Sequence, residues 1–292
     1  MTADQFVNLL AAVTLIVMML TTGMAVRFSD VYQVCRNVDL LARAAIANYI
    51  IVPAAAVALL HLFHAGPMIA AGVLVVAACP GAPYGPPLTA LARGQVVCSV
   101  GIMVFLAGSS AIVAPLLLRF LLPLLARDTA LRIDVLRIVG TLFGTQLLPL
   151  TAGIWIGDRH PQLASKLKPF AGVLSLALNI VLVILIFVLQ FQMLAEIRPR
   201  GYFGMSSLLL ATIAAGWIAS AHMKTSAKTL VLATSVRNVG VALVITTSCF
   251  AGTPAISSAT AYGLFQTLVM ACIALLWGRG SENVPLVEKT AA

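Results

Sequence analysis

The sequence predicts an all-α integral membrane protein with about nine transmembrane helices, and three observations support this fold class. Of the 292 residues, 61% are hydrophobic and only 9% are charged, whereas a soluble domain is about half apolar and about a quarter charged. Apolar runs of about 20 residues, the length of helix that crosses a bilayer, recur along the chain. The polar stretches between these runs are too short to form a separate domain.

Nine apolar runs are long enough to span the hydrocarbon core at a helical rise of about 1.5 Å per residue. In chain order they comprise residues 6–26, 40–63, 67–93, 96–124, 136–157, 169–195, 202–221, 225–250 and 256–277. The third and eighth runs contain residues that interrupt a helix. Runs one to four and runs six to nine each have the interrupted run in third place, and run five separates the two sets. We therefore predict an inverted repeat with two crossed broken helices.

The basic residues between the runs predict the orientation of the chain. With the N-terminus outside, 11 Lys and Arg lie on the inner side and 6 on the outer side. Cytoplasmic loops carry the excess of positive charge, so we expect the N-terminus outside and the C-terminus in the cytoplasm of the cell inner (plasma) membrane. Despite the net charge of +9, no nucleic-acid partner is expected, because the basic residues are scattered between apolar runs.

The segment Cys79-Pro80-Gly81-Ala82-Pro83-Tyr84-Gly85-Pro86-Pro87 interrupts the third run with four prolines and two glycines. Each proline removes an amide donor and clashes with the preceding turn, so carbonyls are released that lipid cannot satisfy. A simple kink or re-entrant turn is the alternative. We interpret the cluster as part of a binding site, since the following half-helix presents a positive N-terminus to an anion.

Arg237 is the only charge deep inside an apolar run, in the segment Ala233-Thr234-Ser235-Val236-Arg237-Asn238. A cation there costs roughly 3 kcal/mol or more unless it is paired or hydrated. No Asp or Glu lies deep in any run, so Arg237 indicates an anionic substrate. The alternative is that Arg237 binds the released carbonyls of the broken helices and only holds them together.

The sequence contains no motif that indicates nucleotide binding, hydrolysis or metal binding. There is no phosphate-binding glycine loop, no nucleophile elbow and no metal-binding His or carboxylate pair. The five cysteines have neither paired spacing nor His partners at zinc-ligand intervals. We therefore expect neither an enzyme nor a cofactor.

Four stretches carry a resemblance to the bile acid:sodium symporter family, over nearly the whole chain. They are residues 20–24 with Asp30, residues 48–53, residues 79–116 and residues 237–240. The resemblance implies a single membrane protein with two parts. The core domain would comprise residues 40–124 and 202–277, and the panel domain residues 6–26 and 136–195.

The sodium-binding positions that the resemblance implies are altered here. Gly85 and Pro86 stand where the family has Ser-Asn, Met103 replaces a Thr, Ala233 replaces a Glu, and Arg237 replaces a Gln. The shorter amide of Asn48 replaces another Gln, while Ser99 is kept. A hard cation requires oxygen ligands and is repelled by a guanidinium, so we expect vestigial ion sites at these positions and no sodium partner.

The sequence thus predicts a secondary transporter that moves a small organic anion, a carboxylate or sulfonate, across the lipid bilayer by alternating access without sodium coupling. The candidate substrate-binding residues are Arg237, Asn238, Thr234, Gly81, Ala82, Pro83, Tyr84, Gln266 and Thr267. Two alternatives stay open. One is a membrane sensor or scaffold that retains the fold without transport, and the other is a symporter coupled to sodium or protons.

Overall fold

The structure, a computed structural model, describes residues 3–125, 133–189, 191–192, 197, 199–221, 223 and 227–280, and within these residues it has helices and no strands. The elements before the mid-chain gap are α1 (Ala3–Met24), α2 (Phe28–Cys35), α3 (Val38–Ile46), η1 (Ala47–Ile51), α4 (Val52–Leu62), α5 (Pro67–Ala78), α6 (Gly85–Leu91) and α7 (Val96–Leu125). Those after it are α8 (Val135–Leu142), η2 (Phe143–Leu147), α9 (Leu148–Arg159), α10 (Pro161–Leu189), α12 (Pro199–Ser220), α13 (Ala227–Ser235), α14 (Val239–Cys249) and α15 (Pro254–Gly280).

The membrane-spanning segments follow the predicted apolar runs. Within the described residues, 8 helical segments are long and apolar enough to cross a bilayer, and each matches one predicted run. The remaining run, residues 67–93, is divided into α5 and the short α6 by the proline-rich segment. The predicted all-α membrane fold is therefore confirmed.

Two spans contain a π-helical turn that ends two residues before a proline. η1 precedes Pro53 and η2 precedes Pro149. A proline ring crowds the carbonyl four residues earlier, and a wider turn accommodates it. Each wide turn also places an amide side chain in the interior, Asn48 in η1 and Gln146 in η2, and both are fully buried.

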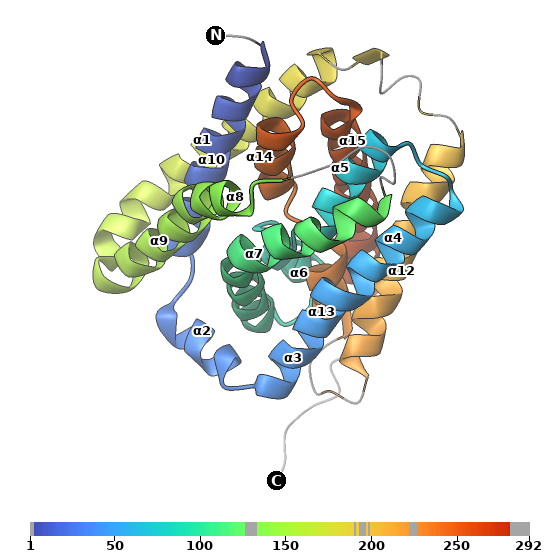
Figure 1. The fold of residues 1–292 in the computed structure, drawn as a ribbon. Helices are drawn as coiled ribbons and strands as arrows, with labels where there is room; N and C mark the ends of the chain where they lie inside the picture. Colours follow the sequence, from blue (N-terminus) through green and yellow to red (C-terminus); the bar gives the residue numbers. More distant parts are fainter. Residues whose placement is uncertain are drawn as a thin grey trace.

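The helices form two groups around a central set (Figure 1). α1, α9 and α10 pack against one another on one side, and α4 and α12 lie on the other. Glycines permit the close approach of α1 and α9, because a Cβ on Gly23 would collide with the backbone around Leu150, and one on Gly153 with Leu20. Small residues at such contacts are typical of helix packing in membranes.

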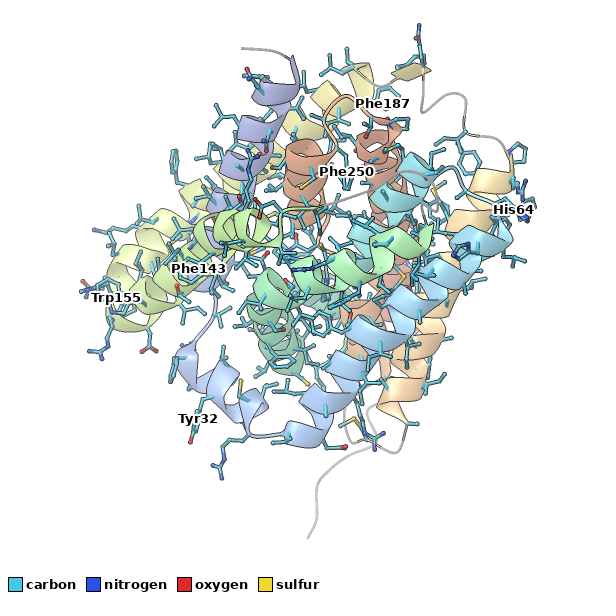
Figure 2. All side chains as sticks on the ribbon, viewed as in Figure 1. Tyr32, His64, Phe143, Trp155, Phe187 and Phe250 are labelled. Carbon is cyan, nitrogen blue, oxygen red and sulfur yellow. The ribbon has the colours of Figure 1, made fainter. Side chains whose placement is uncertain are left out.

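Burial separates the central helices from the peripheral ones. In the most apolar 18-residue stretch of the span formed by α13 and α14, 89% of the residues are buried, whereas in that of α10 only 11% are. Many large apolar side chains project outward from the periphery, and Figure 2 shows Trp155 and Phe187 among them, at 59% and 45% exposure. Such a surface suits lipid, and it leaves the α13–α14 span as the interior of the molecule.

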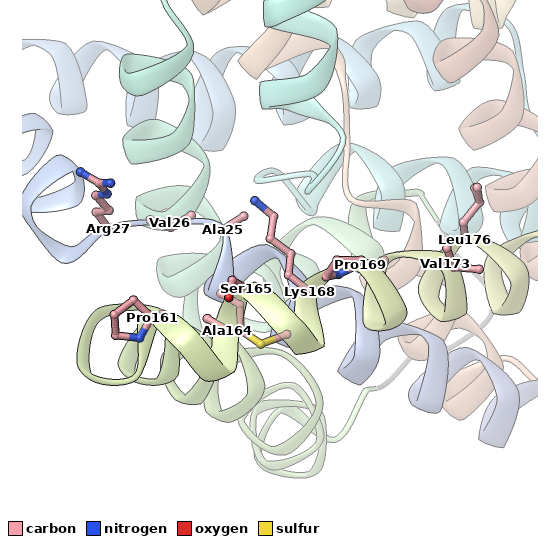
Figure 3. A pocket seen from close by; sticks show the side chains of 13 residues that line it. Ala25, Val26, Arg27, Pro161, Ala164, Ser165, Lys168, Pro169, Val173 and Leu176 are labelled. Atoms are coloured by element: carbon pink, nitrogen blue, oxygen red, sulfur yellow. The ribbon is translucent and has the colours of Figure 1, made fainter.

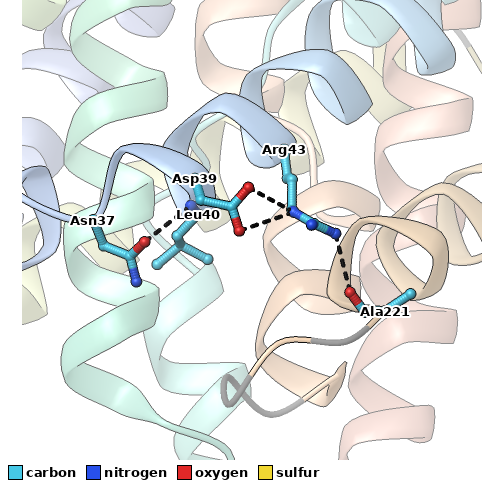
Figure 4. Close-up of polar contacts among 5 residues, drawn as sticks. All are labelled: Asn37, Asp39, Leu40, Arg43 and Ala221. Atoms are coloured by element: carbon cyan, nitrogen blue, oxygen red, sulfur yellow. Dashed lines mark hydrogen bonds and ion pairs between the residues drawn. The ribbon is translucent and has the colours of Figure 1, made fainter.

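A polar contact from the last turn of α3 joins this helix to the end of α12 (Figure 4). Asp39 pairs with Arg43 at 3.0 Å, and Arg43 Nη1 donates to the carbonyl of Ala221 at 3.0 Å. Asn37 caps α3 by accepting from the amide of Leu40. The basic side chain satisfies a carbonyl just past the C-terminal end of α12, which is a favourable place for a cation.

Candidate functional site

The two interrupted spans meet at their breaks. The amide of Asn238, between α13 and α14, donates to the carbonyl of Cys79 at 2.8 Å. The side-chain amide of Asn238 donates to the carbonyl of Gly81 at 3.3 Å, and its oxygen accepts from Val241 at the start of α14. Backbone groups that lipid could not satisfy are thus satisfied by the other broken helix, as the predicted crossing requires.

Gly81 allows the first break to lie against α7. Its φ is +80°, a left-handed conformation that favours glycine. A Cβ at this position would collide with the backbone of α7 at Leu106 and Ala107. Gly81 is therefore required by both its conformation and its surroundings.

Gly81→Ala is expected to lower the thermal stability of the purified protein by several degrees, because strain of about 1 to 3 kcal/mol is added at one residue. The measurement is a melting curve in detergent. Gly85→Ala is the matched control in the same segment, since a Cβ there would meet nothing within 4 Å. Equal melting temperatures for the two variants would contradict the assigned role of Gly81.

Arg237 lies at the centre of the crossing with only 1% of its surface exposed. Its Nε donates to the carbonyl of Val76 at 3.4 Å, and Nη2 donates to the carbonyls of Ala77 and Asn48. Nη1 donates to Oδ1 of Asn48 at 2.5 Å and to the carbonyl of Thr234 at 3.3 Å. A guanidinium has five N–H donors, and each has an acceptor here.

The backbone acceptors lie at helix C-terminal ends and in a π-turn, and the carbonyl of Val76 also accepts from the amide of Cys79 at 3.1 Å. Val76 and Ala77 belong to the last turn of α5, Thr234 to the last turn of α13, and Asn48 to the π-turn η1. Carbonyls at helix C-terminal ends carry partial negative charge. These bonds match the alternative in which Arg237 holds the broken helices together. Direct binding of a substrate by Arg237 stays a prediction, and it would require one of these bonds to open.

Several other predicted substrate-binding residues lie at the same crossing. The hydroxyl of Thr234 accepts from Asn48 Nδ2 at 3.4 Å, and Gln266 Nε2 donates to the carbonyl of Arg237 at 3.3 Å. Ala82 and Pro83 are buried in the break, and Tyr84 is half-buried. Thr267 differs, because its hydroxyl donates to Gly263 of its own helix. A role for these residues in binding is not tested by their positions.

Sequence reasoning missed two buried hydroxyls near this crossing. Tyr262 lies one helical turn before Gln266 on α15, and Ser235 lies two residues before Arg237. Tyr262 Oη, Ser235 Oγ and Gln266 Oε1 are buried and have no hydrogen-bond partner among the described residues. Buried polar atoms are rarely left unpaired. The spacing of four residues between Tyr262 and Gln266, which places both on one helix face, could have revealed Tyr262.

The predicted vestigial ion-site positions fall into two places. Asn48 and Arg237 are in contact, and Ala233 lies in the last turn of α13, four residues before Arg237 in the break. Ser99 on α7 instead shares a hydrogen bond of 3.0 Å with Thr89, which also donates to the carbonyl of Gly85.

Met103 and Pro86 are buried without side-chain oxygen to offer a cation. In the part of the chain that the structure describes, no cluster of three or more His, Cys, Asp or Glu could hold a metal ion.

Comparison with known protein families identifies the family of this chain. The model of the family described as Sodium Bile acid symporter family matches residues 12–197, which is more than half of the chain. The chain belongs to the sodium bile acid symporter family. The matched range begins in α1 and extends past α10, so in this family member the α13–α14 break and Arg237 lie beyond it.

A curated relative agrees with the family assignment. The probable sodium/metabolite cotransporter BASS1, chloroplastic, of Arabidopsis thaliana is 27% identical over 157 residues. The aligned region is 54% of this chain and 38% of the relative, so the chain spans well under two thirds of that protein. As a member of the sodium bile acid symporter family with apolar spanning helices, the chain is a multi-pass membrane protein.

Proposed function

We propose that this chain is a secondary transporter that carries a small organic anion, a carboxylate or sulfonate, by alternating access and without sodium coupling. Membership of a symporter family supports the transport part. The anionic substrate and the absence of sodium coupling rest on one observation. The guanidinium of Arg237 fills the carbonyl-lined centre of the helix crossing.

The argument against sodium is electrostatic and steric. Sodium would need the same type of oxygen ligands that Arg237 already uses. Two unit positive charges about 4 Å apart repel by on the order of 4 kcal/mol at an effective dielectric constant of about 20. That energy corresponds to a loss of roughly 1,000-fold in sodium affinity. The fixed guanidinium therefore takes the place of a coupling ion.

The argument for an anion rests on the charge balance of the interior. Among the described residues, Arg237 is the only charged side chain that is buried. A monovalent anion at the crossing would neutralise it, whereas a cation would not. The unpartnered hydroxyls of Tyr262 and Ser235 can donate to the oxygens of a carboxylate or sulfonate, and the amide of Asn238 is a further donor.

The two parts proposed for alternating access are the core and panel domains as the family resemblance defines them. The core includes both broken helices, and the panel includes α1, α9 and α10. Their different burial supports this division, since α13 and α14 are enclosed while α10 is largely exposed. The substrate would then cross the membrane as the panel and core shift relative to each other around the crossing.

Replacing sodium by choline is expected to leave uptake unchanged to within about twofold, because the carbonyls that would hold a coupling ion are occupied. The measurement is uptake of radiolabelled propionate, benzoate and methanesulfonate into proteoliposomes, with protein-free liposomes as the control. Strict dependence on sodium would contradict the proposal. Sodium-independent uptake of any of the three would support it.

A sensor or scaffold without transport activity is the second candidate. The five hydrogen bonds of Arg237 join α5, α13 and η1, and such a connection could also hold one fixed conformation. Stabilisation of the purified protein by an anion that it does not transport would favour this candidate. Flux of the same anion would exclude it.

A further inference from the structure

A groove lies at one membrane surface, away from the helix crossing. It lies between the C-terminal end of α1 and the first half of α10, next to the end of α9, and has a volume of about 950 Å³. Figure 3 shows it with Arg27, just past α1, and Lys168 of α10 among the residues that line it. Because α1 and α9 end and α10 begins here, the groove lies where lipid headgroups meet the protein.

The mouth of the groove is positively charged. Arg27 and Lys168 are its charged lining residues, and no acidic residue lines it. Both are exposed, and neither forms an ion pair within the described residues. In Figure 3 the two side chains extend to the same side of the ribbon. An anionic group at this position would be attracted by both charges.

The other end of the groove is apolar and open. Val173 and Leu176 line it and are 70% and 57% exposed, although the nearby Met24 is buried. Leu176 lies eight residues beyond Lys168, which is about 12 Å along a helix. Charge at the membrane surface followed by an open apolar wall toward the bilayer matches a phospholipid better than a small soluble anion.

We propose that this groove binds an anionic phospholipid, with its phosphate between Arg27 and Lys168 and its acyl chains along Val173 and Leu176. Basic pockets between transmembrane helices bind anionic headgroups in this way. The bound lipid would contact both α1 and α10. It would therefore stabilise the packing of these two helices independently of any substrate at the crossing.

The test is lipid binding to the purified full-length chain in non-ionic detergent, measured by native mass spectrometry and by melting temperature. Dioleoylphosphatidylglycerol is expected to bind and to raise the melting temperature, and dioleoylphosphatidylcholine to do so far less. Lys168→Ala is expected to weaken phosphatidylglycerol binding about fivefold, and Arg27→Ala with Lys168→Ala to weaken it further. If Lys168→Ala does not fold, Lys168→Gln replaces it as the variant that removes the charge.

Lys166→Ala is the matched control, because Lys166 is exposed on the same helix but does not line the groove. Equal losses for Lys166→Ala and Lys168→Ala would overturn the proposal, as would equal binding of the two lipids. Glycerol 1-phosphate carries the phosphate without acyl chains. If glycerol 1-phosphate displaced bound phosphatidylglycerol as effectively as added phosphatidylglycerol does, the groove would be a site for a free anion and not for a lipid.

Discussion

Arg237→Met is expected to reduce uptake by at least about 100-fold and to lower the melting temperature by more than about 5 °C. Methionine has a similar length but donates no hydrogen bond, so the buried carbonyls of Ala77 and Thr234 and the amide oxygen of Asn48 lose the guanidinium as their partner, while the carbonyl of Val76 keeps the amide of Cys79. Each buried polar atom left unpaired costs about 1 to 3 kcal/mol. Uptake in proteoliposomes and a melting curve in detergent measure the two effects.

Two further variants distinguish the role of Arg237 from a general effect of charge. Arg119→Ala removes one positive charge from an exposed position on α7, and it is expected to change neither uptake nor stability appreciably. Arg237→Lys keeps the charge but offers three donors instead of five, so it should recover part of the stability. If Arg237→Met melted and transported like the unaltered protein, the crossing would not depend on the guanidinium.

The combination of Ala233→Glu with Arg237→Gln is expected to make uptake sodium-dependent, with a stimulation of about tenfold or more. The double variant removes the repelling guanidinium and releases the carbonyls of Val76, Ala77 and Thr234 together with Oδ1 of Asn48. It also adds a carboxylate at position 233, in the last turn of α13. Together these oxygens provide the ligand set that a hard cation prefers. Uptake in sodium and in choline buffer measures the change.

The single variants are the controls for this conversion. Ala233→Glu alone adds a carboxylate in the last turn of α13 but leaves the guanidinium and its hydrogen bonds in place, so its uptake should stay independent of sodium. Arg237→Gln alone lacks an anionic ligand and should be poorly active in either buffer. A folded double variant without any sodium stimulation would show that Arg237 does not occupy a cation position.

The local features of the fold could be predicted from the sequence because their causes are local. Hydrophobic runs of sufficient length predict spanning helices, and the proline cluster from Pro80 to Pro87 predicts where α5 ends. The π-turns η1 and η2 were not predicted. A proline at position 53 or 149 disturbs the preceding turn, but whether the helix kinks or widens depends on the helices packed around it.

The candidate site was predicted less completely than the fold. Arg237, Asn238 and the break at Gly81 could be selected as unusual residues in apolar surroundings, and the structure brings them together. Tyr262 and Ser235 were missed because a single Tyr or Ser in an apolar run is common and carries no local signal. Only their burial without a partner distinguishes them from hydroxyls that bond within their own helix.

The sequence by itself determined that this chain is a helical membrane protein with two interrupted spans and one charge in its interior, since each of these properties depends on neighbouring residues. Only the tertiary structure decided what that charge does. Arg237 bonds Asn48 and Ala77, which lie 189 and 160 residues away along the chain. Every residue has a backbone carbonyl, so the sequence does not indicate which carbonyls accept hydrogen bonds from Arg237. The acceptors are identified only by the fold, which brings together the ends of α5 and α13 and the turn η1.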